Sequence, residues 1–242
     1  MSFKITYKPF GERSVLIEWP LEIKEAILND ILVFQNKIKN SLIKYIIEVK
    51  HAYNSILVTY NKEIDFKNEV DLLKTHYATS NLKLVNTSLL WTIPVCYDSI
   101  FGLDLESLAI EKNMSKEVII STHSEAIYTV YFIGFLPGFL YLGGLNETLY
   151  SPRKSTPRLK IEKGAVAIGG NQTGVYPNES PGGWNIIGNT PISFFNSDVN
   201  PPCFAKAGDK IKFKSVSLDE YLDIKLLVEA GVFQIENNVF NG

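Results

Sequence analysis

Residues 128–135 have the sequence YTVYFIGF, and they begin a series of short strand patterns that continues to IKFKS at residues 211–215. Aromatic and β-branched residues fill these segments, and Gly or Pro turns separate them, as is typical of antiparallel strands. Many short strands with regular turns predict a barrel or a closed sandwich. We therefore expect an all-β fold for this part of the chain.

Glycine is concentrated in the same part of the chain. Eleven of the sixteen glycines lie between Gly134 and Gly188, together with five prolines. Aromatic residues, Arg and Gln are interleaved with them, whereas disordered Gly/Pro linkers lack aromatic residues at this density. The segment is therefore expected to fold, with glycines that serve unusual backbone angles or close backbone approach. Ordinary hairpin turns explain part of the same enrichment.

A different pattern occupies the first 85 residues, where strand and helix periodicities alternate in the order β-β-α-β-β-α. The segments lie at residues 3–10, 14–19, 21–39, 43–52, 55–60 and 66–77. This order predicts a small α+β (ferredoxin-like) domain over residues 1–85, with both helices on one face of an antiparallel sheet. His51 and His76 are expected at its surface or edge, without a functional role.

A polar linker is expected at residues 79–86, between this domain and the β-rich region. After it, WTIPVCYD at residues 91–98 has the pattern of a strand that ends in a loop. Two short helices are expected next, at residues 103–112 and 115–124. Ser115 is the predicted N-cap of the second helix, because a serine hydroxyl accepts a hydrogen bond from the amides of the first turn.

The second domain is predicted to span residues 88–220 as a β-barrel, followed by a C-terminal tail at residues 221–242. Within the tail, LDIKLLVEAGVFQI (222–235) is interpreted as a strand pair around Ala230 and Gly231. The predicted architecture is therefore an α+β N-terminal domain followed by an all-β barrel domain.

The composition limits the classes of function. A hydrophobic fraction of 45% and a charged fraction of 21% are those of an ordinary soluble globular protein. The formal net charge of −2 gives no electrostatic reason to expect nucleic acid or an anionic membrane as partner. No stretch reaches the ~18 apolar residues of a membrane span, and the amino terminus lacks a secretion signal. We expect a cytoplasmic protein.

Cys96 and Cys203 are the only cysteines, they form no CxxC motif, and the chain has three histidines. These are too few soft ligands for a structural zinc site, and no metal site is predicted. A disulfide between the two cysteines is one alternative. Two reduced, buried thiols are the expectation for a cytoplasmic protein.

Arginine is scarce, since Arg13, Arg153 and Arg158 are the only ones among 24 basic residues. Two of the three lie in PRKSTPR (152–158), beside the glycine-rich segment. Where lysine is the default, arginine indicates a need for the planar, bidentate guanidinium. Arg153 and Arg158 are therefore candidates for binding a carboxylate or a phosphate. The alternative is that they pair with carboxylates inside the fold.

His123 is the only histidine of the second region, and it lies at the end of a predicted helix. An unperturbed imidazole has a suitable pKa for a general acid or base. A histidine at this position can equally serve as a simple C-terminal helix cap.

Three motifs dominate the β-rich region: GFLPGFLYLGGL (134–145), PRKSTPR (152–158) and AIGGNQTGVYPNESPGGWNIIG (167–188). Further matching segments are IPVCYD (93–98), DLESLA (104–109), THS around His123, AGDKIKF (207–213) and, more loosely, GERSVLIEW (11–19). Together they closely resemble the bacterial family that includes the B subunit of ATP-dependent 5-oxoprolinase, the sporulation kinase inhibitor and the first subunit of allophanate hydrolase.

The resemblance implies a cyclophilin-like barrel as second domain and an α+β unit as first domain. It also implies partners, the C and A subunits, with which the B subunit opens 5-oxo-L-proline to L-glutamate at the expense of ATP. The proposed route is a phosphorylated lactam, which calls for cations or amide N–H groups around the phosphoryl oxygens. The carboxyl tail loosely resembles the start of the C subunit.

The candidate catalytic residues are His123 and Arg158. The candidate substrate- or nucleotide-binding residues are Phe135, Pro137, Gly138, Phe139, Arg153, Gln172, Thr173, Gly182, Gly183, Trp184 and Asn185. In this interpretation the arginines bind anionic groups, the glycine turns offer amides, the aromatic rings exclude water, and Gln172 and Asn185 orient an amide. Both arginines are expected on one pocket wall with the 172–184 segment, and Arg158→Ala is predicted to abolish turnover without disturbing assembly.

The sequence has no GxxxxGK[ST] motif, no evident Ser-His-Asp arrangement and few acidic residues between 119 and 188. We therefore expect ATP to be shared with a partner protein and the chain to be inactive alone. Two alternatives stay open: an inhibitor of a sensor histidine kinase, and a component of allophanate-type chemistry. An enzyme component is favoured, because an interaction surface needs apolar anchors at its centre rather than arginine-bearing motifs.

Overall fold

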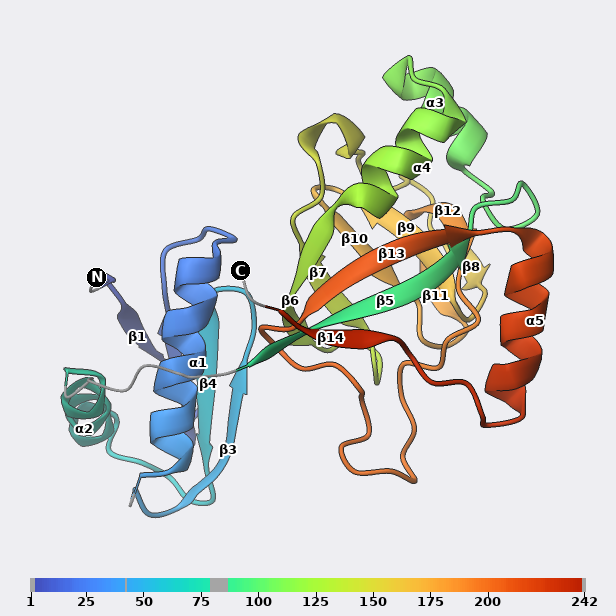
Figure 1. Cartoon of the computed structure of the whole chain (residues 1–242). Coiled ribbons are helices and arrows are strands. Elements are labelled where there is room, and N and C mark those ends of the chain that lie inside the picture. Colours follow the sequence, from blue (N-terminus) through green and yellow to red (C-terminus); the bar gives the residue numbers. More distant parts are fainter. Residues whose placement is uncertain (1–2, 42, 79–86, 241–242) are drawn as a thin grey trace. The chain divides into compact units, whose positions relative to one another are not determined.

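The computed structural model describes residues 3–41, 43–78 and 87–240. The chain divides into two compact units, Met1–Asn86 and Thr87–Gly242. The linker predicted at residues 79–86 lies outside the described residues. Figure 1 colours both units by their position in the sequence.

The first unit follows the predicted β-β-α-β-β-α order (Figure 1). Its elements are β1 (Thr6–Pro9), β2 (Ser14–Glu18), α1 (Glu25–Lys39), β3 (Ile46–His51), β4 (Ser55–Tyr60) and α2 (Phe66–Ala78). The strands form an antiparallel sheet in the order β1-β2-β4-β3. The predicted α+β architecture of this unit is confirmed.

The apolar stripe of α1 explains how the first unit closes its core. Ile27, Ile31 and Phe34 recur at helical spacing and are at most 1% exposed, packed with the inward side chains of β2 and β4. Trp19 and Tyr77 both donate to Asp30, at 2.7 Å each, which fixes α2 against α1. His51 and His76 are half-buried.

The second unit contains the predicted barrel. Seven of the strands in its eight-stranded sheet close into a ring in the order β12-β9-β10-β7-β6-β13-β5, because β12 also pairs with β5 through Asn189 and Cys96. The ring strands are β5 (Ser88–Cys96), β6 (Ile127–Ile133), β7 (Leu140–Gly143), β9 (Ala165–Gly169), β10 (Gln172–Val175), β12 (Asn185–Asn189) and β13 (Lys210–Val216). The predicted all-β barrel is confirmed.

Shorter elements surround the ring (Figure 1). They are α3 (Leu105–Lys112), α4 (Lys116–Glu125), the 3-10 turn η1 (Glu147–Leu149), and the two-stranded sheet of β8 (Arg158–Ile161) with β11 (Ser180–Gly182). The Ser115 side chain accepts from the Val118 amide, so the predicted N-cap is confirmed. The PRKSTPR motif (152–158) ends at the first residue of β8, and the motif at residues 167–188 contains β11.

The C-terminal segment differs from the prediction. The expected strand pair around Ala230 and Gly231 is wrong: α5 spans Leu218–Glu229, and β14 (Asn237–Phe240) pairs with β5. Ser217 and Glu220 form a capping box that starts α5. Because α5 begins at residue 218, the expected domain end at residue 220 falls inside a helix.

Apolar side chains fill most of the barrel interior. Its buried side chains come from every ring strand and from α3 and α4, among them Ile93, Val95, Tyr128, Val130, Leu142, Val166, Ile168, Val175, Ile187, Ile211 and Phe213. A second, smaller cluster gathers around Phe139, Tyr176 and Trp184 on one side of the barrel. Among the described helices, none has the length and apolar character that crossing a membrane requires.

Candidate functional site

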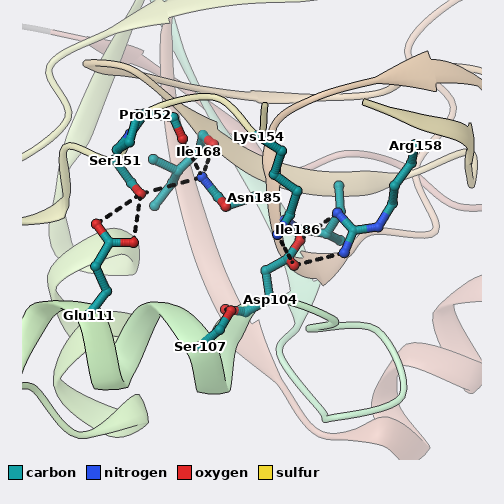
Figure 2. Close-up of polar contacts among 10 residues, drawn as sticks. All are labelled: Asp104, Ser107, Glu111, Ser151, Pro152, Lys154, Arg158, Ile168, Asn185 and Ile186. Atoms are coloured by element: carbon teal, nitrogen blue, oxygen red, sulfur yellow. Dashed lines mark hydrogen bonds and ion pairs between the residues drawn. The ribbon is translucent and has the colours of Figure 1, made fainter. Parts of the chain in front are cut away.

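A buried carboxylate joins three segments of the second unit (Figure 2). Asp104, just before α3, is 3% exposed. Arg158 donates to both of its oxygens, at 2.8 and 2.7 Å, and the Lys154 ammonium lies 2.7 Å from Oδ1. The Ile186 amide donates to Oδ2 at 2.7 Å. Burial alone raises the pKa of Asp104, but these donors outweigh it and hold the pKa below its ordinary value.

A second set of hydrogen bonds holds the start of the PRKSTPR segment (Figure 2). The buried Asn185 amide donates to the Pro152 carbonyl at 3.0 Å and to the Ile168 carbonyl at 3.3 Å. Ser151 exchanges backbone hydrogen bonds with Gly170, at 3.1 and 2.7 Å. The segment is therefore tied to the barrel before and after residue 153.

Arg153 lies between these attachments. The Lys154 amide donates to the Gly183 carbonyl at 2.7 Å, which brings the backbone beside Arg153 against the glycine turn. The Arg153 guanidinium carbon lies 5.6 Å from the centroid of the Trp184 ring, within the range of a cation–π contact. Within residues 3–41, 43–78 and 87–240, no carboxylate pairs with Arg153.

The guanidinium borders a cavity of about 130 Å³. Its lining residues are Phe135, Phe139, Tyr141, Arg153, Tyr176, Pro181, Gly182, Gly183 and Trp184. Phe139 meets both Tyr176 and Trp184 edge-to-face, with ring centroids 5.6 and 5.7 Å apart. The result is an aromatic pocket with one cationic wall, of a size suited to a small metabolite.

Glycine lets the indole of Trp184 lie against the barrel. A Cβ on Gly169 would lie 2.6 Å from atoms of the indole, and one on Gly174 would lie 3.2 Å from it. Any larger residue at position 169 must displace the ring, because a Cβ does not approach that closely. The glycine enrichment predicted for close approach is confirmed at this position.

The turn between β6 and β7 forms the rim of the pocket. Phe135 has a φ of +69°, which is rare for a residue with a side chain, and Gly138 has a φ of +84°. This turn leaves Phe135 68% exposed and aims Phe139 inward, where it is 2% exposed. Such strained backbone is concentrated at functional sites, which agrees with a binding role for the rim.

The pocket keeps its phenols protonated. Burial raises the pKa of Tyr176 and of Tyr141, and the positive charge of Arg153 offsets only part of this rise. Both hydroxyls therefore remain hydrogen-bond donors at neutral pH. The site can combine one guanidinium, two phenol donors and aromatic faces around a small anionic molecule.

Six of the predicted binding residues line this pocket: Phe135, Phe139, Arg153, Gly182, Gly183 and Trp184. Sequence reasoning missed three lining residues, Tyr141, Tyr176 and Pro181. The i, i+2 spacing of Phe139 and Tyr141 is a signal for Tyr141, because alternate residues of a strand share a face. Asp104 was also missed.

The other predicted binding residues lie elsewhere. Asn185 holds the Pro152 carbonyl, and Thr173 is fully buried beside His123. Pro137 and Gly138 shape the rim turn, and Gln172 begins β10, half-buried. None of these five residues is among the lining residues of the pocket.

Arg158 does not line the aromatic pocket that Arg153 borders. Both terminal nitrogens of its guanidinium donate to Asp104, so the alternative of an internal carboxylate partner describes Arg158. It borders a different cavity, of about 210 Å³, together with residues such as Phe101, Ile161 and Asn189. The expectation that both arginines converge on one ligand is wrong, because pairing with Asp104 turns one of them away.

His123 is enclosed by the barrel and is 0% exposed. The Thr173 hydroxyl donates to the Ala167 carbonyl and so accepts from Nε2 of His123, 2.8 Å away. Nδ1 then accepts from the Tyr97 hydroxyl at 2.7 Å. Burial lowers the pKa of His123 to about 3, so the ring stays neutral. This position gives no support to a role as general acid or base.

The buried His123 should make the second unit sensitive to acid. Its pKa falls from 6.5 to about 3 on folding, so the unfolded chain binds an extra proton between these values and stability decreases as the pH falls. At pH 5 the loss amounts to about 2 kcal/mol relative to neutral pH. The free energy of unfolding is measured by urea denaturation at pH 7 and at pH 5, for the wild type and for His123→Gln. Between the two pH values the variant should lose about 2 kcal/mol less stability than the wild type. Equal losses would contradict the lowered pKa of His123.

Cys96 and Cys203 are both free thiols, the first buried and the second half-buried. Burial raises the pKa of both thiols, so neither is an activated nucleophile. In the described part of the chain, His, Cys, Asp and Glu side chains form no group of three or more that could hold a metal ion.

Comparison with known proteins places this geometry in a family context. The model of the carboxyltransferase domain, subdomain C and D, matches residues 5–205. The chain is 34% identical over 233 residues to the B subunit of 5-oxoprolinase from Bacillus subtilis (strain 168), a match that covers 91% of this chain and 97% of that protein. It is 38% identical over 205 residues to the 5-oxoprolinase B subunit of Haemophilus influenzae, covering 85% and 95%.

A solved structure shares the fold. The crystal structure of the K. lactis urea amidolyase superimposes with a TM-score of 0.81 over 98% of this chain, at 19% sequence identity. This chain spans 16% of that much longer protein. At this identity the likeness shows a common architecture, an α+β unit followed by a barrel.

Proposed function

The chain belongs to the family of 5-oxoprolinase B subunits, and we propose on that basis that it is the B component of an ATP-dependent 5-oxoprolinase. In this proposal it acts with the A and C components in the cytoplasm, and the complex opens 5-oxo-L-proline to L-glutamate. The chain alone is inactive, because the described residues supply no nucleophile–base pair beside the aromatic pocket.

One observation carries the assignment of the substrate site. The Arg153 guanidinium stands over Trp184 at the wall of the aromatic pocket, and no described carboxylate pairs with it. A guanidinium in such a place is suited to a carboxylate through two parallel hydrogen bonds. 5-Oxo-L-proline has one carboxylate on a small ring, so its carboxylate would meet Arg153 and its ring would meet the aromatic faces.

Nucleotide does not fit this pocket. A cavity of about 130 Å³ is well below the ~300 Å³ at which pockets for larger ligands begin. The chain also lacks a phosphate-binding GxxxxGK[ST] loop. We therefore assign ATP to a site that the partner proteins supply in whole or in part.

Reconstitution tests the proposal. Purified chain mixed with its A and C partners should release glutamate from 5-oxo-L-proline only when ATP is present. Omitting this chain should reduce glutamate release to the background rate, measured with a coupled glutamate dehydrogenase assay. Full activity without this chain would reject its role as the B component.

The same purified chain can be used to distinguish this proposal from the kinase-inhibitor alternative. A sensor histidine kinase with its dimerisation helix is mixed with the chain, and autophosphorylation is followed. The proposed function predicts no inhibition at concentrations that saturate the reconstituted complex. Inhibition together with absent glutamate release would favour the regulator.

A further inference from the structure

We propose that Asp104 is a positioning residue for the substrate site, which holds Lys154 and Arg158 so that Arg153 alone faces the aromatic pocket. This inference rests on the proposed function, because it concerns the same carboxylate-binding wall. Asp104 lies outside the lining of the pocket, so it acts through Arg153 and does not touch the substrate.

The contacts of Asp104 hold two of the residues around Arg153 in place. Figure 2 shows the Asp104 carboxylate between Lys154, Arg158 and the Ile186 amide. Each of its oxygens accepts two of the four contacts, all between 2.7 and 2.8 Å. The side chain of Asp104 is 4% exposed, and those of Lys154 and Arg158 are 30% exposed. Four contacts hold the Asp104 carboxylate in one orientation. Asp104 in turn fixes Lys154, which follows Arg153, and Arg158, which ends the PRKSTPR segment.

Asp104 also neutralises two of the positive charges near the pocket. The PRKSTPR segment carries three cations, Arg153, Lys154 and Arg158, within six positions. Asp104 pairs with two of them, whereas no described carboxylate pairs with Arg153, which lies over the Trp184 ring. Without Asp104, Lys154 and Arg158 would be free to compete for an incoming anion. The buried carboxylate therefore selects which cation receives the substrate.

The test uses Asp104→Asn in the reconstituted enzyme, with 5-oxo-L-proline as the varied substrate. An asparagine keeps the size of the side chain and the acceptor for Ile186, but it removes the charge that holds both cations. We expect KM to rise roughly tenfold with kcat nearly unchanged, as for loss of substrate alignment without loss of the reacting groups. A merely structural role would instead lower the amount of active enzyme, which reduces apparent kcat and leaves KM unchanged.

Glu106→Gln is the matched control. Glu106 lies on α3, two residues from Asp104, and it also pairs with a lysine, Lys116 at 2.8 Å, but it is exposed. The same acid-to-amide change there should leave both KM and kcat at the wild-type values. If Asp104→Asn does not fold, Lys154→Met removes one of the two held cations at a half-exposed site, and it should raise KM by roughly two- to threefold.

A double-mutant cycle with Arg153→Lys decides whether Asp104 acts through Arg153. An ammonium is a point charge with little orientational requirement, so Asp104→Asn should raise KM much less in the Arg153→Lys background than in the wild type. If Asp104→Asn raised KM by the same factor in both backgrounds, the positioning role would be overturned. If Arg153→Lys alone left KM unchanged, the proposed substrate site would be wrong. The two outcomes are distinguishable, because the second needs only the single variant.

Discussion

Arg153→Ala is expected to raise KM for 5-oxo-L-proline by about 100-fold in the assembled enzyme. A charge-assisted, two-point contact with a carboxylate is worth about 1.5–3 kcal/mol, and each 1.4 kcal/mol corresponds to a factor of ten. In the proposed site this contact depends on the Arg153 guanidinium, because the other two cations of the PRKSTPR segment pair with Asp104. Loss of the side chain would leave the pocket with aromatic faces and neutral donors.

The measurement is glutamate release as a function of 5-oxo-L-proline concentration, at saturating ATP and partner proteins. Arg153→Lys should give an intermediate KM, because lysine keeps the charge and loses the bidentate geometry. Arg13→Ala is the matched control, since Arg13 is an exposed arginine of the first unit. An Arg153→Ala enzyme with wild-type KM would show that the substrate carboxylate binds elsewhere.

Periodic patterns in the sequence predicted most of the fold. The first unit was read correctly because each of its elements has one apolar face, as in α1 with Ile27, Ile31 and Phe34. The prediction for the C-terminal segment was wrong for a physical reason. Its short apolar run suits a strand or a helix, and the capping box at Ser217 and Glu220 was the overlooked signal that selects a helix.

Six of the nine residues that line the candidate pocket were predicted from the sequence, but the pairing of its neighbouring charges was not. The scarcity of arginine drew attention to PRKSTPR, and Arg153 of that segment lines the aromatic pocket. The sequence could not tell which of its two arginines pairs with a carboxylate inside the fold. The partner of Arg158, Asp104, is 54 positions away, so their contact depends on how α3 meets β8. Likewise, the low pKa of His123 follows from enclosure by the barrel, which no local pattern reports.

Gly169→Ala is the second change with a large expected effect, on stability. The added methyl would lie 2.6 Å from three atoms of the Trp184 indole, and Trp184 is 5% exposed and enclosed by Phe139 and Tyr176. Overpacking of this kind costs about 1–3 kcal/mol, and we expect the upper end because a rigid ring cannot yield locally. Urea denaturation followed by tryptophan fluorescence measures the loss. The displaced indole should also raise KM, because Arg153 rests on it.

A matched pair of variants isolates the clash at Gly169. Gly134→Ala adds the same methyl where the nearest atoms lie at 3.5 Å, an ordinary contact, and it should cost much less. Combining Gly169→Ala with Trp184→Phe shrinks the ring that the methyl meets, so the double variant should be more stable than the sum of the two single losses predicts. Strict additivity, or a Gly169→Ala protein as stable as the wild type, would mean that the indole is not held against β9 as described.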